Sequence, residues 1–209
     1  MKNIIRFITL SFFLTSFSLI AHPVIYKGGW VYQGSFMPMM NKMRVGYSMN
    51  SRFALVANSN WFQQLGDYRD YSLGVNTLLK RWLSQDAQGN LYAGVHAGQY
   101  RDNASEGSVI NPFFMADWES RDHYTVFQSK GYLYDNKSVY DYTLRYGFAP
   151  FRAGMKDLQT WFILQAYYFE EQSREVLVTP MIRFFYRNVL WEAGYSTKGQ
   201  SYLTLMIHY

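Results

Sequence analysis

Charged side chains recur at alternate positions of otherwise apolar segments. They are the strongest candidates in the sequence for binding or conducting a charged solute. If they share an enclosed interior, they either pair and fill it, because buried charges persist only when partnered, or line a passage. In a passage, an excess of Lys and Arg would attract anions, since charge in a low-dielectric channel concentrates counter-ions. The sequence leaves both interpretations open. A basic lining is predicted at Lys42, Arg44 and Lys80.

The densest acidic point of this pattern is the pair Asp117 and Glu119, which flanks Trp118. Two carboxylates at adjacent positions of one face repel each other unless cations lie opposite. We therefore expect a charge cluster in which arginines, above all Arg145 and Arg183, face these carboxylates. Its predicted members are Asp117, Glu119, Asp141, Arg145, Arg183, Arg187 and Glu192.

A methionine-rich run suggests a different chemistry. Met37, Met39, Met40 and Met43 lie close together beside the first expected turn, and thioether sulfur is a soft ligand suited to Cu(I). If His22 is the first residue of the mature chain, its amine and imidazole could bind Cu(II). Alternatively, Met43 faces lipid and the other methionines line a turn, so that no metal or other cofactor is needed. Copper handling is one alternative function.

Lipid hydrolysis by a Ser and His pair at the edge of the bilayer is a second alternative. The best candidate base is His123, and the best nucleophiles are Ser120 and Ser129. Their spacing matches no recognised catalytic constellation, and a His beside a turn is commonly a hydrogen-bonded interfacial side chain. We therefore predict that the chain is not an enzyme.

The elements that must position these residues are strands. Apolar residues alternate with polar ones in segments of about ten residues, the length that a tilted strand needs to cross a bilayer. Short connections with turn residues separate the segments, so neighbours in sequence should pair. The polar face is thin in Lys and rich in Gly, unlike the solvent face of a soluble sandwich. We predict an all-β fold, a closed antiparallel up-and-down transmembrane β-barrel of about twelve strands, with ten as the alternative count.

Composition agrees with a membrane barrel. Aromatic residues make up 20% of the chain, with 19 Tyr, 16 Phe and 6 Trp, and such side chains suit the girdles where hydrocarbon meets water. Lys2 and Arg6 precede an apolar run that ends near Ala21, which predicts a signal peptide over residues 1–21 and a barrel domain over residues 22–209. The sequence has no Cys, which excludes a disulfide framework and thiolate chemistry.

The stretch from Tyr202 to Tyr209 resembles the terminal strand by which outer-membrane β-barrel proteins are recognised and inserted, which has alternating apolar residues and a final aromatic. Its apolar row is Leu203, Leu205, Ile207 and Tyr209; Phe is the usual last residue of such strands, so Tyr209 departs from the pattern. The resemblance implies the outer membrane of a Gram-negative bacterium. It also implies contact with outer-membrane lipid, and with the barrel-assembly machinery during biogenesis.

These observations predict a narrow channel, or a passive structural or binding element, with a charged interior. Short loops leave little chain outside the membrane to recognise a large ligand. Small anionic solutes are the expected partners of a channel. Nucleic acid is not expected, because the Arg and Lys residues are scattered instead of forming one stripe.

Overall fold

The computed structural model describes residues 27–37, 39–63, 65–154, 157–171 and 175–209. The predicted signal peptide and His22 therefore lie outside the described residues. In the described part, no helix has the length and apolar character needed to cross a membrane. The strands are β1 (Trp30–Phe36), β2 (Asn41–Ser48), β3 (Phe53–Phe62), β4 (Tyr68–Leu83), β5 (Ala87–Arg101), β6 (Glu106–Ser120), β7 (His123–Tyr134), β8 (Lys137–Phe148), β9 (Gln159–Phe169), β10 (Leu177–Tyr186), β11 (Val189–Tyr195) and β12 (Ser201–His208).

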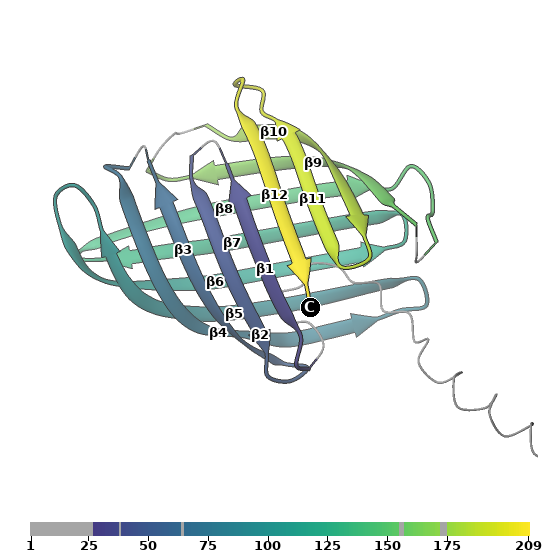
Figure 1. Cartoon of the computed structure of the whole chain (residues 1–209), viewed down its shortest axis with the longest axis horizontal. Helices are drawn as coiled ribbons and strands as arrows, with labels where there is room; N and C mark the ends of the chain where they lie inside the picture. The colour runs from purple at the N-terminus through teal and green to yellow at the C-terminus, as the bar shows by residue number, and fades with distance from the viewer. Residues whose placement is uncertain (1–26, 38, 64, 155–156, 172–174) are drawn as a thin grey trace, which may run out of the picture.

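The described strands form one closed antiparallel barrel (Figure 1). Each strand pairs with its neighbours in sequence, and β1 closes the barrel by pairing with β12, where Gly34 lies opposite Leu205. Trp30 and Tyr209 extend this seam by exchanging two backbone hydrogen bonds, with N to O distances of 2.7 and 2.8 Å. The predicted fold class and the count of twelve strands are confirmed, and the alternative of ten strands is wrong.

Side chains alternate between the interior and the exterior of the barrel, as β12 illustrates. Tyr202, Thr204 and Met206 are buried, whereas Leu203 and Leu205 are 48% and 49% exposed. Successive side chains of a strand point to opposite faces, so the apolar row stands on the outside of the closed barrel. An exposed apolar band of this kind is suited to contact with acyl chains.

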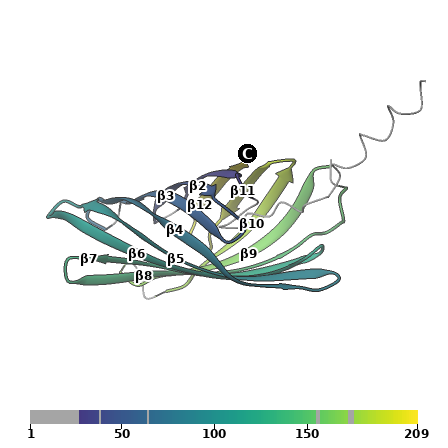
Figure 2. The ribbon, with the colours of Figure 1, turned by 90° about the horizontal axis from the view of Figure 1, so that it is seen from below.

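The barrel is flattened, and its strands differ in length. In Figure 2, β4 to β8 form one long layer, and β1 to β3 with β10 to β12 form a shorter layer facing it. The strand β4 has 16 residues, while β1 and β11 have 7 each. The interior is therefore a slot between two crossing layers, narrow enough for side chains from both layers to meet.

The beginning of β1 and the end of β12 lie at one end of the barrel, which we call the terminal end. The turns β2–β3, β4–β5, β6–β7, β8–β9 and β10–β11 lie there too, and the remaining turns lie at what we call the opposite end. At the terminal end, Arg152 in the β8–β9 connection donates two hydrogen bonds to the carboxylate of Asp122 in the β6–β7 turn. These hydrogen bonds lower the pKa of Asp122, and they tie the two connections together.

A β-bulge in β4 changes which residues face inward. The register of β4 against β5 shifts between Leu78 and Lys80. Lys80 is exposed, with Nζ 5.8 Å from the centre of the Trp82 ring, whereas Nε of the next residue, Arg81, donates to Oδ1 of Asn90 at 2.7 Å. A bulge inserts one extra residue and shifts the alternation beyond it. The predicted place of Lys80 in the lumen is therefore wrong, and Arg81 takes the inward position.

Candidate functional site in the barrel lumen

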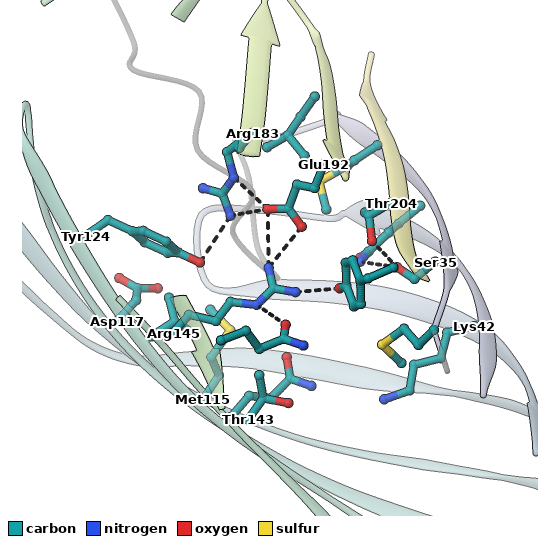
Figure 3. A pocket seen from close by; sticks show the side chains of 18 of the residues that line it. Ser35, Lys42, Met115, Asp117, Tyr124, Thr143, Arg145, Arg183, Glu192 and Thr204 are labelled. Carbon is teal, nitrogen blue, oxygen red and sulfur yellow. Dashed lines mark hydrogen bonds and ion pairs between the residues drawn. The ribbon is translucent and has the colours of Figure 1, made fainter. Parts of the chain in front are cut away.

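A cavity of about 120 Å³ lies inside the barrel (Figure 3). It is lined from β1, β2 and β6 to β12, because the inward-facing residues of all these strands converge on the slot. Most of the lumen residues predicted from alternation contribute to it. The charged residues of its lining are Lys42, Arg44, Asp117, Glu119, Arg145, Arg183 and Glu192.

Two arginines share one carboxylate beside this cavity. Nη1 of Arg145 donates to Oε2 of Glu192 at 3.1 Å, and Nε of Arg183 donates to Oε1 at 2.6 Å. Glu192 is 1% exposed. The remaining guanidinium donors bind neutral groups: Arg145 donates to Gln165 at 2.7 Å and Tyr202 at 2.5 Å, and Arg183 donates to Tyr124 at 3.1 Å. We call Arg145, Arg183 and Glu192 the central ion cluster.

A second group of charges lies on β2, β7 and β8. Nζ of Lys42 donates to Oδ2 of Asp141 at 2.9 Å, and the Tyr132 hydroxyl donates to the same oxygen at 3.0 Å. Lys130, which is buried, donates to Asn60 at 3.2 Å. Lys42, Arg44 and Lys130 line a second cavity of about 60 Å³. We call these three residues the basic wall.

Asp117 and Glu119 form an acidic wall on β6. Both line the larger cavity, and Asn90 donates to Oδ1 of Asp117 at 2.6 Å. In Figure 3, Asp117 and Lys42 lie on opposite sides of this cavity. The lumen therefore presents an acidic wall and a basic wall, with the central ion cluster beside them.

The predicted single charge cluster is thus divided into separate groups, and one member is misplaced. Arg145 and Arg183 join Glu192, while Asp141 pairs with Lys42. Arg187 is exposed in the β10–β11 turn, with φ 55° and its guanidinium over the Tyr186 ring. The prediction for Arg187 is wrong because the strand ends at the preceding residue, so alternation does not reach it.

Sequence reasoning missed Lys130 and Arg81. Lys130 shares the inward face of β7 with Tyr124 and Tyr132, so strict alternation along this strand would have found it. Polar residues on both faces of β7 hide that alternation. Arg81 follows the bulge, and the sequence carries no clear signal of where a bulge lies.

The methionine-rich run does not converge on one point. Met39 and Met40 are buried among aromatic rings inside the barrel, and Met37 packs against them. Met43 is 62% exposed on the outer face. The predicted four-methionine site is therefore wrong, because the wall of the barrel separates Met43 from the others; the contribution of His22 lies outside the described residues.

The proposed hydrolase residues make other contacts. Nδ1 of His123 is 2.9 Å from the hydroxyl of Tyr146. Oγ of Ser120 accepts from the backbone N–H groups of Asp122 and His123 and donates to the carbonyl of His123. These bonds shape the β6–β7 turn, and they give no support to a catalytic pair of Ser120 and His123.

An aromatic cluster fills the lumen at the opposite end. Phe62 lies at its centre, with ring centroids 4.9 Å from Tyr132, 5.1 Å from Phe169 and 5.6 Å from Tyr68. These four side chains are each 1% exposed. The cluster also contains Met39, Met40, Tyr100, Val109, Tyr134, Val139, Tyr167 and Leu177. Aromatic residues were expected in outer girdles, and this inward set was not predicted.

No family model matches the chain, and no curated protein matches it. Among solved structures, the chain is similar to one described as KdgM porin, with 12% identity over 87% of this chain and 98% of that chain, and a TM-score of 0.51. A KdgM porin in complex with disordered oligogalacturonate matches with 11% identity over the same shares and a TM-score of 0.50. The chain thus has the fold of the bacterial outer-membrane β-barrel proteins that its last strand resembles, in agreement with the predicted location in a Gram-negative outer membrane.

Proposed function

We propose that this barrel is a narrow outer-membrane channel for small charged solutes, with a preference for anions. The observation that carries the proposal is the lining of the two cavities. The two cavities are lined by five cations, Lys42, Arg44, Lys130, Arg145 and Arg183, and by three carboxylates, Asp117, Glu119 and Glu192. Asp141, which pairs with Lys42, lies outside this lining, so the excess of cations is a property of the cavity surface. An excess of positive charge in a passage with low-dielectric walls raises the local concentration of anions.

Arg44 is the residue best placed to attract a passing anion. Its Nε donates to Oδ1 of Asn58 at 3.3 Å, and its guanidinium lies 5.5 Å from the centre of the Phe113 ring. Among the described residues, no carboxylate forms an ion pair with it within 4.0 Å. Its charge is therefore less compensated than that of Arg145 or Arg183, which share Glu192.

The similar KdgM porin was solved with oligogalacturonate, an acidic oligosaccharide. That complex supports the idea that a barrel of this architecture admits anions. In the present barrel the cavity is about 120 Å³ and the aromatic cluster fills one end. We therefore assign it small solutes, and we place the narrowest part of the passage at the aromatic cluster.

A passive structural element is the second candidate function. The central ion cluster and the aromatic cluster together occupy much of the slot, as expected of charges and rings that plug a lumen. Such a barrel would insert into membranes and conduct nothing. We rank it second because a plug needs no unpaired cation, and Arg44 forms no ion pair with any carboxylate in the part of the chain that the structure describes.

Planar-bilayer recording tests the proposal. The purified barrel should give discrete current steps, and in a KCl gradient the reversal potential should have the sign of chloride selectivity. Arg44→Gln should shift the reversal potential toward zero, because it removes uncompensated positive charge from the passage. Arg187→Gln, which removes the same charge from the exposed β10–β11 turn, should leave it unchanged. The absence of current steps under every salt condition would leave the structural element as the function.

A further inference from the structure

The smaller cavity, of about 60 Å³, is lined by cations and carboxamides, and no carboxylate of the described residues lines it. Its cations are the basic wall. The rest of its polar lining consists of the side chains Gln33, Asn58, Asn60 and Gln128. The smaller cavity adjoins the larger one, because both are lined by Gln33, Lys42, Arg44 and Gln128. A solute in the larger cavity therefore meets this group of donors directly.

Strand pairing holds the donors close together. In the register of β2 against β3, Arg44 lies opposite Asn58, and its Nε donates to Oδ1 of that side chain at 3.3 Å. Lys42 lies opposite Asn60, two positions further along β3. Nζ of Lys130 reaches across the slot from β7, in the facing layer (Figure 2), and donates to Oδ1 of Asn60 at 3.2 Å. Positions two apart on a strand are separated by about 6.5 Å, so Arg44 and Lys130 are within reach of one small anion.

Two of the three cations have no carboxylate partner. Among the described residues, neither Arg44 nor Lys130 forms an ion pair with a carboxylate, although Lys130 is only 3% exposed. Lys42 and Arg44 also lie close enough to Lys130 to repel its ammonium group. Buried charges persist when a partner of opposite sign is held against them. An anion between Arg44 and Lys130 would be that partner for both.

Two carboxylates compensate part of this charge from outside the cavity. Asp141 pairs with Lys42 at 2.9 Å, and Asp70 accepts from Asn60 at 2.7 Å. Neither carboxylate lines the cavity. The three cations of the basic wall against these two carboxylates leave one positive charge in excess, and this excess favours an anion.

Asn58 adds a free donor to the site. The residue is 7% exposed, and its Nδ2 has no hydrogen-bond partner among the described residues. Because Oδ1 of the same side chain accepts from Arg44, the free amide group lies beside the guanidinium. Donors thus approach the cavity from β2, β3 and β7. An anion with oxygens in every direction accepts from all three strands at once, which a planar carboxylate or a halide does less well.

We propose that the smaller cavity binds one inorganic tetrahedral oxyanion of the phosphate type, held by Arg44, Lys130 and Nδ2 of Asn58. This inference rests on the proposed function, the passage of small anions, and it names the class of anion that the passage binds. A cavity of about 60 Å³ has about four times the room that one water needs in this measure. That space accommodates a phosphate ion and excludes an oligosaccharide.

Equilibrium binding to the purified, folded wild-type barrel tests the inference without requiring conductance. The probe is inorganic phosphate, and the matched probes are acetate, which is a planar oxyanion, and chloride, which has no oxygens. In titration calorimetry at constant ionic strength, phosphate should bind about tenfold more tightly than either matched probe, because it alone accepts from all three strands. Equal affinities for the three anions, or no binding of phosphate, would overturn the proposal.

Two variants locate the site. Lys130→Gln should weaken phosphate binding about tenfold, because it removes a charge-assisted hydrogen bond. Asn58→Asp keeps the size of the side chain but replaces the free donor by a carboxylate that repels the anion, so it should weaken binding by at least as much.

The matched control is Lys80→Gln, which removes the same charge as Lys130→Gln from the exposed position beyond the β4 bulge and should leave the affinity unchanged. Heat-modifiable migration on a gel reports that each variant is folded. An unchanged affinity of folded Lys130→Gln for phosphate would contradict the proposal.

The two proposals fail in different ways. A barrel that binds phosphate selectively and passes no current keeps its oxyanion site and loses its channel function. A barrel that conducts with chloride selectivity and binds the three anions alike keeps the channel function and loses the oxyanion site. Because the comparison of anions uses the wild-type protein, it decides the inference even where a variant does not fold.

Discussion

At the scale of single residues, the lumen depends on a carboxylate that serves two arginines. Glu192 is buried and accepts from Arg145 and Arg183, and these three residues come from β8, β10 and β11. Charges removed from water are tolerated when their partners are held in good geometry. The closed ladder provides that geometry, because Arg183 lies directly opposite Glu192 in the pairing of β10 with β11.

Glu192→Gln should therefore destabilise the barrel strongly. The substitution leaves two buried guanidinium groups without their shared carboxylate, and breaking a buried ion pair from one side costs about 3–5 kcal/mol. Urea unfolding in detergent micelles or lipid vesicles measures this as a lower transition midpoint. Glu175→Gln removes an exposed carboxylate in the β9–β10 connection and should change the free energy of unfolding by about 1 kcal/mol or less. Equal stability of the two variants would show that the Glu192 pairs contribute little.

Alternation predicted most of the charges that face inward, with Lys80 and Arg187 as exceptions, but it did not predict which charges pair. Asp117, Arg145 and Glu192 line the cavity, as predicted. In each case the neighbouring residues along the strand are apolar or small and belong to the outer face, so the alternation is easy to recognise. Their partners depend on strand register and on the flattened cross-section, which bring β8 and β11 together across the slot. Neither property is encoded in the local pattern of any one strand. The predicted cluster joined Arg145 to Asp117 and Glu119 as well as to Glu192; among the described residues, the ion pair of Arg145 is with Glu192.

At the scale of elements, β12 supports the barrel through its two different faces. Leu203 and Leu205 face outward, and Tyr202 and Thr204 face inward, where Thr204 donates to Ser35 of β1 at 2.9 Å. The sequence predicted this strand correctly because its alternation is strict from Tyr202 onward. In β4 the alternation is interrupted by the bulge between Leu78 and Lys80. Counting every second residue along the strand therefore gives the wrong face for the residues beyond the bulge.

Leu205→Arg should impair insertion into lipid. Leu205 lies near the middle of β12 on the exterior, where an arginine at the bilayer midplane costs about 2–4 kcal/mol. Folding from urea into lipid vesicles measures this free energy. Ser201→Arg places the same side chain at the exposed start of β12, where the cost falls to about 0–1 kcal/mol. Similar costs at the two positions would mean that Leu205 does not face acyl chains.

At the scale of the whole molecule, the two ends of the lumen have different linings. The opposite end is filled by aromatic rings from several hairpins, while charged and polar residues line the cavity behind them. The high aromatic content of the chain is typical of membrane girdles, and girdles were the only place that we expected for it. Part of that content fills the lumen, and alternation alone does not separate a ring that faces headgroups from one that closes the interior.

Phe62→Ala should widen the passage. Phe62 contacts Tyr68, Tyr132 and Phe169 at the centre of the aromatic cluster, so its removal opens space at the narrowest part and should raise single-channel conductance by about twofold or more. Phe148→Ala removes the same ring from the outer face of β8 and should leave conductance unchanged. A conductance that is the same in both variants would place the constriction elsewhere.

The central claim is that the apolar rows outside the closed barrel contact acyl chains while the charged rows face a lumen. Because the sequence has no Cys, single cysteines carrying a spin label can be placed along β12 in lipid vesicles, and their collision rates with oxygen, which concentrates in hydrocarbon, can be measured. We predict high rates at positions 203, 205 and 207 and low rates at positions 202, 204 and 206. Uniform rates along the strand, or the inverse alternation, would contradict the account.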